Sequence, residues 1–169
     1  MNNIYLIGFM GSGKTSVGKY LARVNEYPFI ETDKEIEADC GMTIPEIFNT
    51  RGEEYFREKE SMLLLKAAGR DNAVVSCGGG VPLRKRNVEI MKKTGTIVYL
   101  TAEPKTIYER IKNERHRPLL EGKMNPEEIR RMMMIREEDY EAAADLTICT
   151  DGKTIMDIGE EIFRIFQNK

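Results

Sequence analysis

The sequence contains no tryptophan, a single histidine and only three cysteines among its 169 residues. Cys40, Cys77 and Cys149 are an odd number and lack the spacing of metal ligands, which argues against a disulfide framework and against a zinc site. No run of residues approaches the roughly 18 apolar residues that a membrane-spanning helix needs, and the short apolar N-terminus lacks the marks of a signal peptide. We therefore expect a cytoplasmic protein, in a reducing compartment, that has no membrane partner.

An excess of charge of one sign is also missing. The 26 Lys and Arg residues nearly balance the 28 Asp and Glu residues, and the formal net charge is −2. This balance gives no reason to expect a nucleic-acid partner. No repeat, low-complexity tract or linker divides the sequence, and its length suffices to bury a core. We expect one domain, residues 1–169, that acts as a monomer.

The most informative motif follows the first apolar run. Residues 8–15 read Gly-Phe-Met-Gly-Ser-Gly-Lys-Thr, which matches G-x-x-x-x-G-K-[ST] between a strand pattern and a helical pattern. Glycines let backbone amides approach a polyphosphate, and the following helix directs its positive end at the same charge. Lys14 would reach the β- and γ-phosphates, and the Thr15 hydroxyl would ligate Mg²⁺. The alternative is a turn that serves geometry alone, but such a turn needs neither the lysine nor the hydroxyl.

Short apolar runs alternate with longer helical patterns along the whole sequence. Strands are predicted at residues 4–7, 28–30, 73–76, 96–100 and 146–149. This alternation indicates parallel strands with right-handed crossovers in a three-layer α/β/α sandwich. Ligands of such a sheet bind at the carboxyl ends of the strands, where the phosphate loop, Asp33 and residues 78–80 all fall.

Two of these segments contain groups suited to a second substrate. A carboxylate at Asp33 could accept a hydrogen bond from a substrate hydroxyl and orient or deprotonate it, although a helix cap is an equally ordinary role for an aspartate here. Gly78, Gly79 and Gly80 are costly in chain entropy. They favour a place where a ligand lies against bare backbone, with a flexible turn as the alternative.

Arginines in three other segments complete the predicted site. Arg57 and Arg136 stand among acidic residues, and each alone would be an ordinary ion-pair partner on a helix. Beside a phosphate loop, they suggest two guanidinium groups that converge on a substrate carboxylate. Arg117 lies in a charged segment, residues 113–124, that we predict to be a mobile lid. Its closure would bring Arg117 onto the phosphates and exclude water.

Taken together, these segments closely resemble the shikimate kinase family, in the nucleoside-monophosphate-kinase-like group of P-loop enzymes. The resemblance covers nearly the whole sequence and rests on motifs at residues 7–15, 33–37, 47–60, 78–80 and 117–120, with Arg136 and Tyr140. It implies a five-stranded parallel sheet in the order 2-3-1-4-5, with a helical substrate-binding insertion at about residues 33–60. It also implies transfer of the γ-phosphoryl group of ATP to the 3-hydroxyl of shikimate, with Mg²⁺ as cofactor, on the route to aromatic amino acids.

The resemblance assigns roles residue by residue. The implied catalytic residues are Lys14, Asp33 and Arg117. The implied ATP contacts are Gly11, Ser12, Gly13, Lys14, Thr15, Ser16, Arg110, Arg117 and Lys153. The implied shikimate contacts are Asp33, Arg57, Gly79, Gly80 and Arg136. Thr15 is the implied magnesium ligand, with help from Glu31 through a water molecule.

Three positions depart from the family's usual residues. Glu31 replaces an aspartate, and its extra methylene would shift the contact to magnesium. Ser12 replaces an alanine and leaves its backbone amide available. Cys77 stands where threonine is common and so lacks a hydroxyl near the phosphates.

Two alternatives differ in what they require. Another kinase of this fold would act on gluconate or on a nucleotide, and a nucleotide kinase would need a base-reading pocket. A nucleotide-binding regulatory module would need no arginine cluster that meets a small acid.

Overall fold

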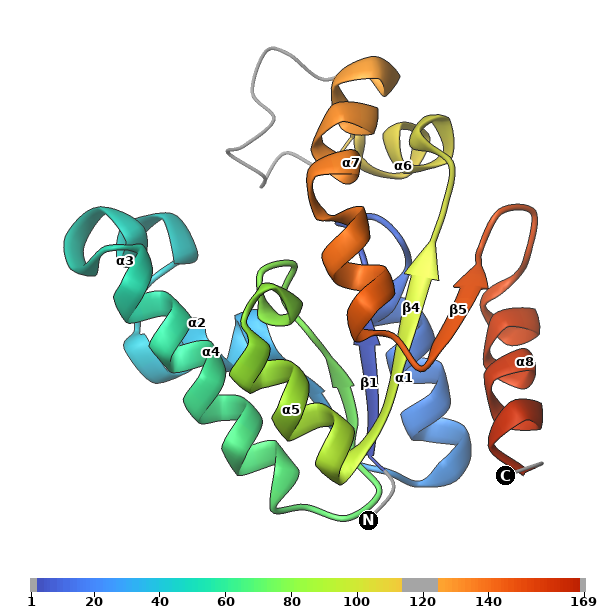
Figure 1. Ribbon diagram of the computed structural model, residues 1–169, viewed down its shortest axis with the longest axis horizontal. Coiled ribbons are helices and arrows are strands. Elements are labelled where there is room, and N and C mark those ends of the chain that lie inside the picture. The colour runs from blue at the N-terminus through green and yellow to red at the C-terminus, as the bar shows by residue number, and fades with distance from the viewer. Residues whose placement is uncertain (1–2, 114–124, 168–169) are drawn as a thin grey trace.

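The computed structural model describes residues 3–113 and 125–167. Five parallel strands form one sheet in the order β2-β3-β1-β4-β5 (Figure 1). The strands are Asn3–Ile7 (β1), Phe29–Glu31 (β2), Val74–Ser76 (β3), Gly95–Thr101 (β4) and Leu146–Cys149 (β5). Every predicted strand is confirmed to within one residue at each end, and so are the three-layer architecture and the strand order.

Helices connect the strands and cover both faces of the sheet. Within the described residues they are α1 (Lys14–Asn25), α2 (Thr32–Cys40), α3 (Ile44–Arg51), α4 (Glu53–Ala68), α5 (Lys85–Thr94), α6 (Pro104–Ile111), α7 (Pro126–Ala143), α8 (Ile155–Gln167) and a short 3₁₀ helix, η1 (Val81–Leu83).

The central strand β1 shows how one strand serves two cores. Successive side chains of a strand point to opposite faces of the sheet. Ile4 and Leu6 pack with apolar residues of α1 and α8, whereas Tyr5 and Ile7 pack with those of α4, α5 and α7. All four are buried. The near-continuous apolar run is therefore what a strand covered on both faces requires.

Two smaller apolar clusters hold helices around the carboxyl ends of the strands. One joins α2, α3 and α4 through Ile36, Ile47 and Phe56. The other packs α6 and α7 against Phe9 of the first loop and contains Ile129. Figure 1 shows these two groups of helices on opposite sides of the strand ends. The functional residues that follow lie on elements of both groups and on the loops between them.

Helix α7 has a well-defined start that fixes the position of its later residues. The Asn125 side chain accepts a hydrogen bond from the Glu128 amide at 2.9 Å, and Pro126 occupies the first turn. Both features favour helix initiation at this point. Arg136 and Tyr140 follow on the same helix, one turn apart.

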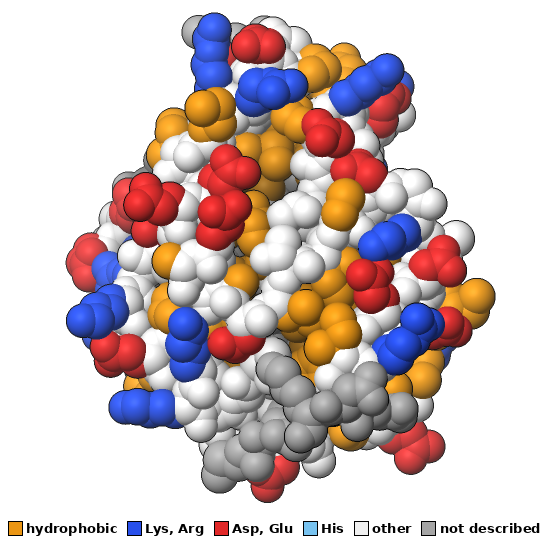
Figure 2. All heavy atoms as spheres, turned by 45° about the vertical axis from the view of Figure 1, so that its right-hand side comes forward, with side chains coloured by type: hydrophobic (Ala, Val, Ile, Leu, Met, Phe, Trp, Pro, Cys, Tyr) orange, Lys and Arg blue, Asp and Glu red, His pale blue; other side chains and the backbone are white. Residues whose placement is uncertain are grey.

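The surface of the molecule mixes both signs of charge. On the face drawn in Figure 2, blue Lys and Arg side chains alternate with red Asp and Glu side chains. Of the helices in the described ranges, none is long and apolar enough to span a bilayer.

Candidate active site

The phosphate loop joins β1 to α1 and depends on backbone conformations that favour glycine. Gly8, Gly11 and Gly13 all have positive φ, and Gly13 is the residue that caps α1. A side chain at Gly8 would lie 2.5 Å from the backbone oxygen of Leu100. The positive end of α1 thus meets a loop in which side chains are excluded, which is the arrangement that binds phosphates.

Lys14 lies over this loop. Its Nζ donates hydrogen bonds to the backbone oxygens of Gly8, at 2.7 Å, and Phe9, at 3.1 Å. The ammonium group is therefore held at the loop, where the phosphates of a nucleotide would bind.

Ser12 buries its side chain in the phosphate loop, and its backbone amide is bonded within the loop. Its side chain is buried, and Oγ has no hydrogen-bond partner among the described residues. Its amide donates to the backbone oxygen of Phe9 at 3.1 Å. In this structure, the amide that we predicted to be available for phosphate is engaged within the loop.

Thr15 and Glu31 bring two oxygen atoms together beside the loop. Thr15 Oγ1 donates to Glu31 Oε1 at 2.9 Å, and Lys34 pairs with the other carboxylate oxygen at 3.4 Å. Within the described ranges, no group of three or more His, Cys, Asp or Glu side chains gathers around a point. A hydroxyl and one carboxylate fit Mg²⁺, because this ion is usually held by few protein oxygens together with phosphate oxygens and water.

The two residues predicted near the adenine differ in their contacts. Arg110 Nη1 donates to the backbone oxygen of Gly11 at 3.1 Å and to Thr150 Oγ1 at 3.0 Å, so it ties the phosphate loop to the loop after β5. Lys153, in that same loop, pairs instead with Glu161 of α8 at 2.6 Å. The structure brings Arg110, but not the Lys153 ammonium, against the phosphate loop.

The three glycines after β3 form the centre of a second group. Each is faced by a different functional side chain: a Cβ at Gly78 would overlap the Asp33 carboxylate, one at Gly80 would overlap the Arg57 guanidinium group, and one at Gly79 would lie 2.8 Å from Arg136 Nη1. A side chain at any of these three positions would therefore displace the functional group that faces it. The structure thus gathers residues from α2, α4 and α7 around one loop.

Three hydrogen bonds hold this glycine loop, two of them buried and one partly buried, and they come from side chains on α2, α7 and α5. The Gly78 amide donates to Thr32 Oγ1 at 2.8 Å, Tyr140 OH donates to the Gly79 oxygen at 2.7 Å, and Asn87 Nδ2 donates to the Val81 oxygen at 3.0 Å. Sequence reasoning missed Thr32 and Asn87, and it had Tyr140 only as part of the family pattern. The available signals were weak: Thr32 precedes Asp33, and Tyr140 follows Arg136 by one helical turn.

Asp33 lies inside this group, and its surroundings disfavour its charged form. Burial raises the pKa of the Asp33 carboxyl, and the nearby positive charge of Lys14 opposes that shift. The alternative role as a helix cap is not observed, because the cap position of α2 is Glu31 and makes no side-chain cap hydrogen bond. Asp33 lies in the first turn of the helix, with its carboxylate against Gly78.

Arg57 is held by two carboxylates of its own helix. Its Nη1 donates to Glu60 Oε2 at 2.8 Å, and its Nη2 pairs with Glu53 at 3.2 Å. The ordinary ion-pair role that we kept as an alternative is therefore real, and it coexists with the contact to Gly80. Arg136, in contrast, forms no salt bridge with any of the described residues.

Glu60 is a buried residue that sequence reasoning treated only as part of an acidic helix. Its side chain is 1% exposed, and burial raises its pKa against the opposing effect of the hydrogen bond from Arg57. Its second oxygen, Oε1, has no hydrogen-bond partner among the described residues and faces Gly78. The helical spacing was the available signal, because Glu60 lies four residues after Phe56 and four before Leu64, which are both buried.

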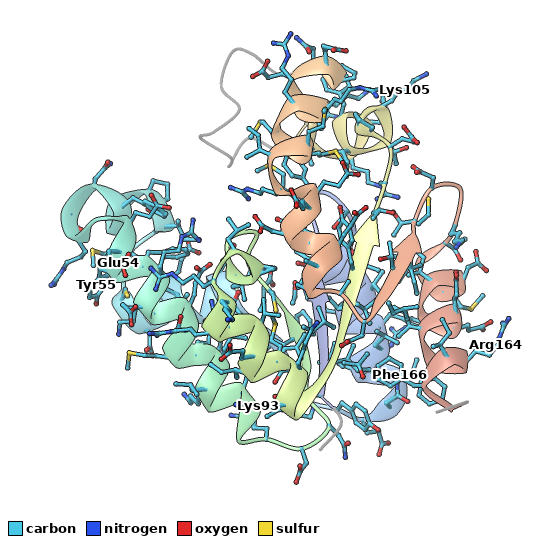
Figure 3. All side chains as sticks on the ribbon, in the orientation of Figure 1. Glu54, Tyr55, Lys93, Lys105, Arg164 and Phe166 are labelled. Atoms are coloured by element: carbon cyan, nitrogen blue, oxygen red, sulfur yellow. The ribbon has the colours of Figure 1, made fainter. Side chains whose placement is uncertain are left out.

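A hollow of about 450 Å³ adjoins the second group. Its lining includes Arg57 and Gly80, and the other lining residues are Glu53, Glu54, Leu83 and Arg84. Glu54, labelled near the start of α4 in Figure 3, pairs with Arg84 at 2.7 Å. This rim joins α4 to the segment that follows η1.

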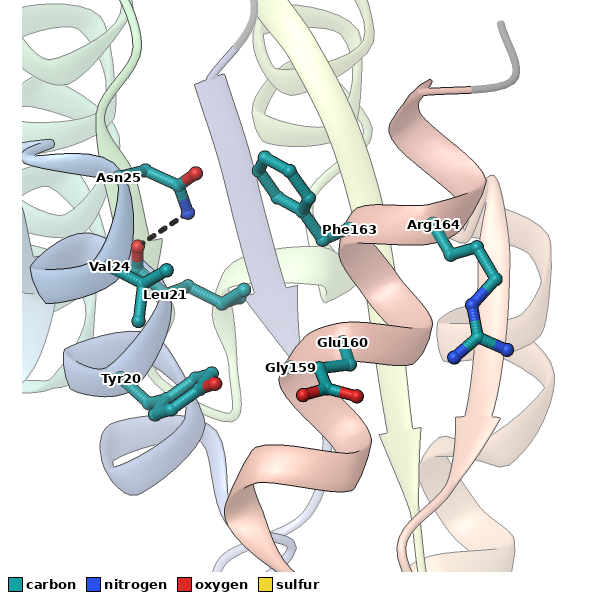
Figure 4. A pocket seen from close by; sticks show the side chains of 8 residues that line it. All are labelled: Tyr20, Leu21, Val24, Asn25, Gly159, Glu160, Phe163 and Arg164. Carbon is teal, nitrogen blue, oxygen red and sulfur yellow. Dashed lines mark hydrogen bonds between the residues drawn. The ribbon is translucent and has the colours of Figure 1, made fainter.

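A second groove, of about 330 Å³, lies between α1 and α8 and has no residue in common with the predicted site. Its lining residues are Tyr20, Leu21, Val24, Asn25, Gly159, Glu160, Phe163 and Arg164 (Figure 4). The site is therefore identified by the convergence of chemical groups rather than by the presence of a hollow.

Two predicted features need separate comment. Arg117, with nearly all of the predicted lid, lies outside the described residues. Cys77 belongs to the core: its thiol is buried beside the sulfur of Met91 at 3.9 Å, and burial raises its pKa. Its departure from the usual threonine therefore places sulfur in an apolar cluster.

The fold and the site together define a class of protein. A loop with a lysine and a hydroxyl suits a nucleoside triphosphate, and a carboxylate with two guanidinium groups beside it suits a hydroxylated acid. The glycine loop follows β3, and the phosphate loop follows β1, which pairs directly with β3. The two loops therefore lie next to each other at the carboxyl ends of these strands. The chain is a P-loop phosphotransferase of small molecules.

Comparison with known proteins identifies the family within that class. A family model described as shikimate kinase matches residues 10–167. A shikimate kinase of Symbiobacterium thermophilum is 41% identical over 169 residues, which cover 99% of this chain and 97% of that protein. A solved shikimate kinase from Acinetobacter baumannii, in complex with shikimate, has a TM-score of 0.90 at 37% identity, covering 100% of this chain and 95% of the other.

A more distant likeness concerns the fold alone. A gluconokinase from Sinorhizobium meliloti 1021 has a TM-score of 0.59 at 19% identity, covering 99% of this chain and 94% of the other. The chain belongs to the shikimate kinase family. It is accordingly an enzyme that uses ATP with Mg²⁺, and the alternative of a gluconate or nucleotide kinase is not favoured.

Proposed function

We propose that this protein transfers the γ-phosphoryl group of ATP to the 3-hydroxyl of shikimate and gives shikimate 3-phosphate and ADP. Membership of the shikimate kinase family supports this reaction. The single observation that carries the assignment of residues is the convergence of Asp33, Arg57 and Arg136 on three successive glycines beside the phosphate loop.

The two guanidinium groups bind the carboxylate of the acid. Arginine can donate two parallel hydrogen bonds to a carboxylate, which fixes the orientation of the bound ring as well as its charge. Arg57 is oriented in advance by Glu60 and Glu53. Arg136 forms no ion pair within the described ranges, so its guanidinium group is available to pair with the carboxylate of the substrate. Gly79 and Gly80 leave room for the ring to lie against the backbone.

Asp33 receives the hydroxyl that is phosphorylated. A buried carboxylate whose pKa is raised holds a proton more readily than an exposed one, so it is suited to accept the hydroxyl proton as the oxygen attacks phosphorus. The bond from the γ-phosphorus to the bridging oxygen of ADP breaks in the same displacement. Charge develops on the phosphoryl oxygens, and Lys14 lies at the loop that would hold them.

Magnesium would be held by Thr15 and Glu31. When bound, the ion neutralises charge on the β- and γ-phosphates and helps to align them. The direct hydrogen bond between the two side chains supports Glu31 as the residue that would help to hold the ion through a water molecule. Gly11, Ser12, Gly13 and Ser16 contribute the loop and the first turn of α1, while Arg110 braces the loop on its adenine side.

Other predictions extend this assignment. Arg117 would close onto the phosphates as part of the lid at residues 113–124, and Lys153 would leave Glu161 to contact the nucleotide. The helical insertion at about residues 33–60 would bind the acid. We further propose that the enzyme acts as a monomer in the cytoplasm. Free thiols at Cys40, Cys77 and Cys149 support a reducing compartment.

One set of measurements tests the assignment. ADP release should require shikimate and should not occur with gluconate or nucleoside monophosphates. Isothermal titration with shikimate, run with and without a non-hydrolysable ATP analogue, should show binding of the acid in both cases. ADP release with gluconate and none with shikimate would overturn the proposed reaction.

A further inference from the structure

We call the proposed shikimate-binding group around Gly78, Gly79 and Gly80 the acid site. Two buried polar side chains behind it have not been assigned a role so far. Ser61 of α4 and Asn87 of α5 are both completely buried. Ser61 Oγ lies 2.7 Å from Asn87 Oδ1 and 3.2 Å from the backbone oxygen of Arg57. Both of these oxygens only accept, so Ser61 has one hydrogen to donate between the two, and the shorter contact is the one to Asn87.

The other end of the asparagine reaches the glycine loop. Asn87 Nδ2 donates to the backbone oxygen of Val81 at 3.0 Å, and Val81 follows Gly80 directly. A continuous chain of contacts therefore runs from the backbone of Arg57, through two interior side chains, to the loop residue beside Gly80. We call these two side chains the Ser61–Asn87 bridge.

The Ser61–Asn87 bridge lies behind the contact between Arg57 and Gly80, which is part of the proposed binding site for the acid. Arg57 and Gly80 meet so closely that a Cβ at Gly80 would overlap the guanidinium group. A small change in the distance between α4 and the loop would therefore move Arg57 relative to Gly80. Apolar side chains of similar size would bury the same interface without the cost of desolvating polar groups, whereas hydrogen bonds specify one register of the two elements.

Asn3 provides a natural comparison at the far end of the same helix. It is also completely buried, its Nδ2 donates to the backbone oxygen of Ala67 at 3.3 Å, and its Oδ1 accepts from the Ala73 amide at 2.8 Å. Buried asparagines thus hold α4 at two places, Asn87 at its middle through Ser61 and Asn3 at its C-terminal end through Ala67. Asn87 adjoins the glycine loop, whereas the contacts of Asn3 lie before β3 begins.

We propose that Ser61 and Asn87 are positioning residues that set the register of Arg57 against Gly80 and so determine the affinity for the acid. They do not touch the substrate themselves. The inference rests on the proposed role of Arg57 in binding the carboxylate.

The test compares variants at the middle and at the C-terminal end of α4. Ser61→Ala and Asn87→Ala should raise the KM for shikimate roughly three- to tenfold, as expected for loss of an interior hydrogen bond. The KM for ATP and kcat should change less than about twofold, because the phosphate loop is untouched. Asn3→Ala should lower the melting temperature but leave the KM for shikimate unchanged. Ser61→Ala, the smaller change, keeps the test valid if Asn87→Ala fails to fold.

A double-mutant cycle separates positioning from general loosening of the fold. If the bridge acts through Arg57, Ser61→Ala should add no further increase in the KM for shikimate when Arg57 is already alanine. A further increase in that background would overturn the proposal, and so would an unchanged KM in folded Ser61→Ala. Failure of Arg57→Ala alone to raise this KM would instead overturn the proposed carboxylate site.

Discussion

The phosphate loop and the acid site lie side by side, yet they are built in different ways. The phosphate loop is made by one short stretch of chain, in which three glycines and the start of α1 supply the geometry. The acid site is assembled from α2, α4 and α7 around a loop after β3. One is local in sequence and depends on backbone, whereas the other is distributed and depends on side chains.

This difference determines how each region should respond to mutation. Changes in the phosphate loop should reduce the rate of transfer and leave affinity for the acid nearly intact. Changes around the glycine loop should alter the binding of shikimate with smaller effects on ATP, except at Asp33, where the proposed proton transfer makes the rate the affected quantity. The four variants below test that separation, in order of decreasing expected effect.

Lys14→Ala should have the largest effect. Removing a cation from the transferring phosphoryl group should lower kcat by about 10³-fold or more, while the affinity for shikimate measured by titration stays within about twofold. Lys19→Ala, an exposed lysine on the same helix, is the matched control for loss of charge. Retention of full turnover by Lys14→Ala would refute the assignment of the loop.

Asp33→Asn should lower kcat by about 10²-fold or more, because the amide cannot take the hydroxyl proton. It should also raise stability near neutral pH. A carboxyl whose pKa is raised on folding contributes stability below its unfolded pKa and loses that contribution as pH rises through the folded pKa. The gain in melting temperature should therefore be greatest at about pH 7.5 and shrink towards about pH 4.

Asp39→Asn on the same helix is the control for Asp33→Asn, since the Asp39 side chain is 73% exposed. Thermal unfolding of both variants at the two pH values makes the comparison. An equal response of the two variants would show that burial of Asp33 does not govern its charge.

Arg136→Lys should raise the KM for shikimate by roughly tenfold or more and leave the KM for ATP unchanged, because a lysine cannot donate two parallel hydrogen bonds to a carboxylate. Steady-state kinetics with each substrate varied in turn measures the split. Arg131→Lys, an exposed position on the same helix, should leave both values as they are. If the KM for ATP alone changed, the assignment of Arg136 to the carboxylate of shikimate would be wrong.

Tyr140→Phe should have the smallest effect of the four. It removes only the hydroxyl that donates to the Gly79 oxygen at 2.7 Å, and we expect the KM for shikimate to rise about two- to tenfold. Tyr5→Phe is a close control, because Tyr5 is also buried and its hydroxyl bonds to Thr94 near the start of β4. An identical KM in the two variants would mean that the glycine loop keeps its position without Tyr140.

The same contrast explains what the sequence could predict. The inner strands β1, β3 and β4 are largely buried and give nearly continuous apolar runs. The edge strands β2 and β5 were found as short apolar segments between helical patterns, and the phosphate loop was found from one contiguous motif. The strand order, however, came from the family resemblance. Nothing in the local pattern says that β3 lies between β2 and β1.

The acid site was predicted less completely because its members are far apart in the chain. Asp33, Arg57 and Arg136 stood out by their charge beside a phosphate loop, before the family resemblance was considered. Glu60 and Asn87 did not, because a polar residue is not expected in the interior even where, as at Glu60, the spacing of apolar neighbours marks a buried face. The folded structure shows that both side chains face the interior.

The overlap at the glycine loop also bears on how substrate preference can evolve. A larger residue can enter at position 80 only if Arg57 moves away, and Arg57 is held in turn by Glu60. A substitution at position 80 would therefore act on the proposed carboxylate contact through Arg57, and a substitution at Glu60 would do the same from the other side. Substrate preference in this part of the protein thus depends on three coupled positions rather than on one.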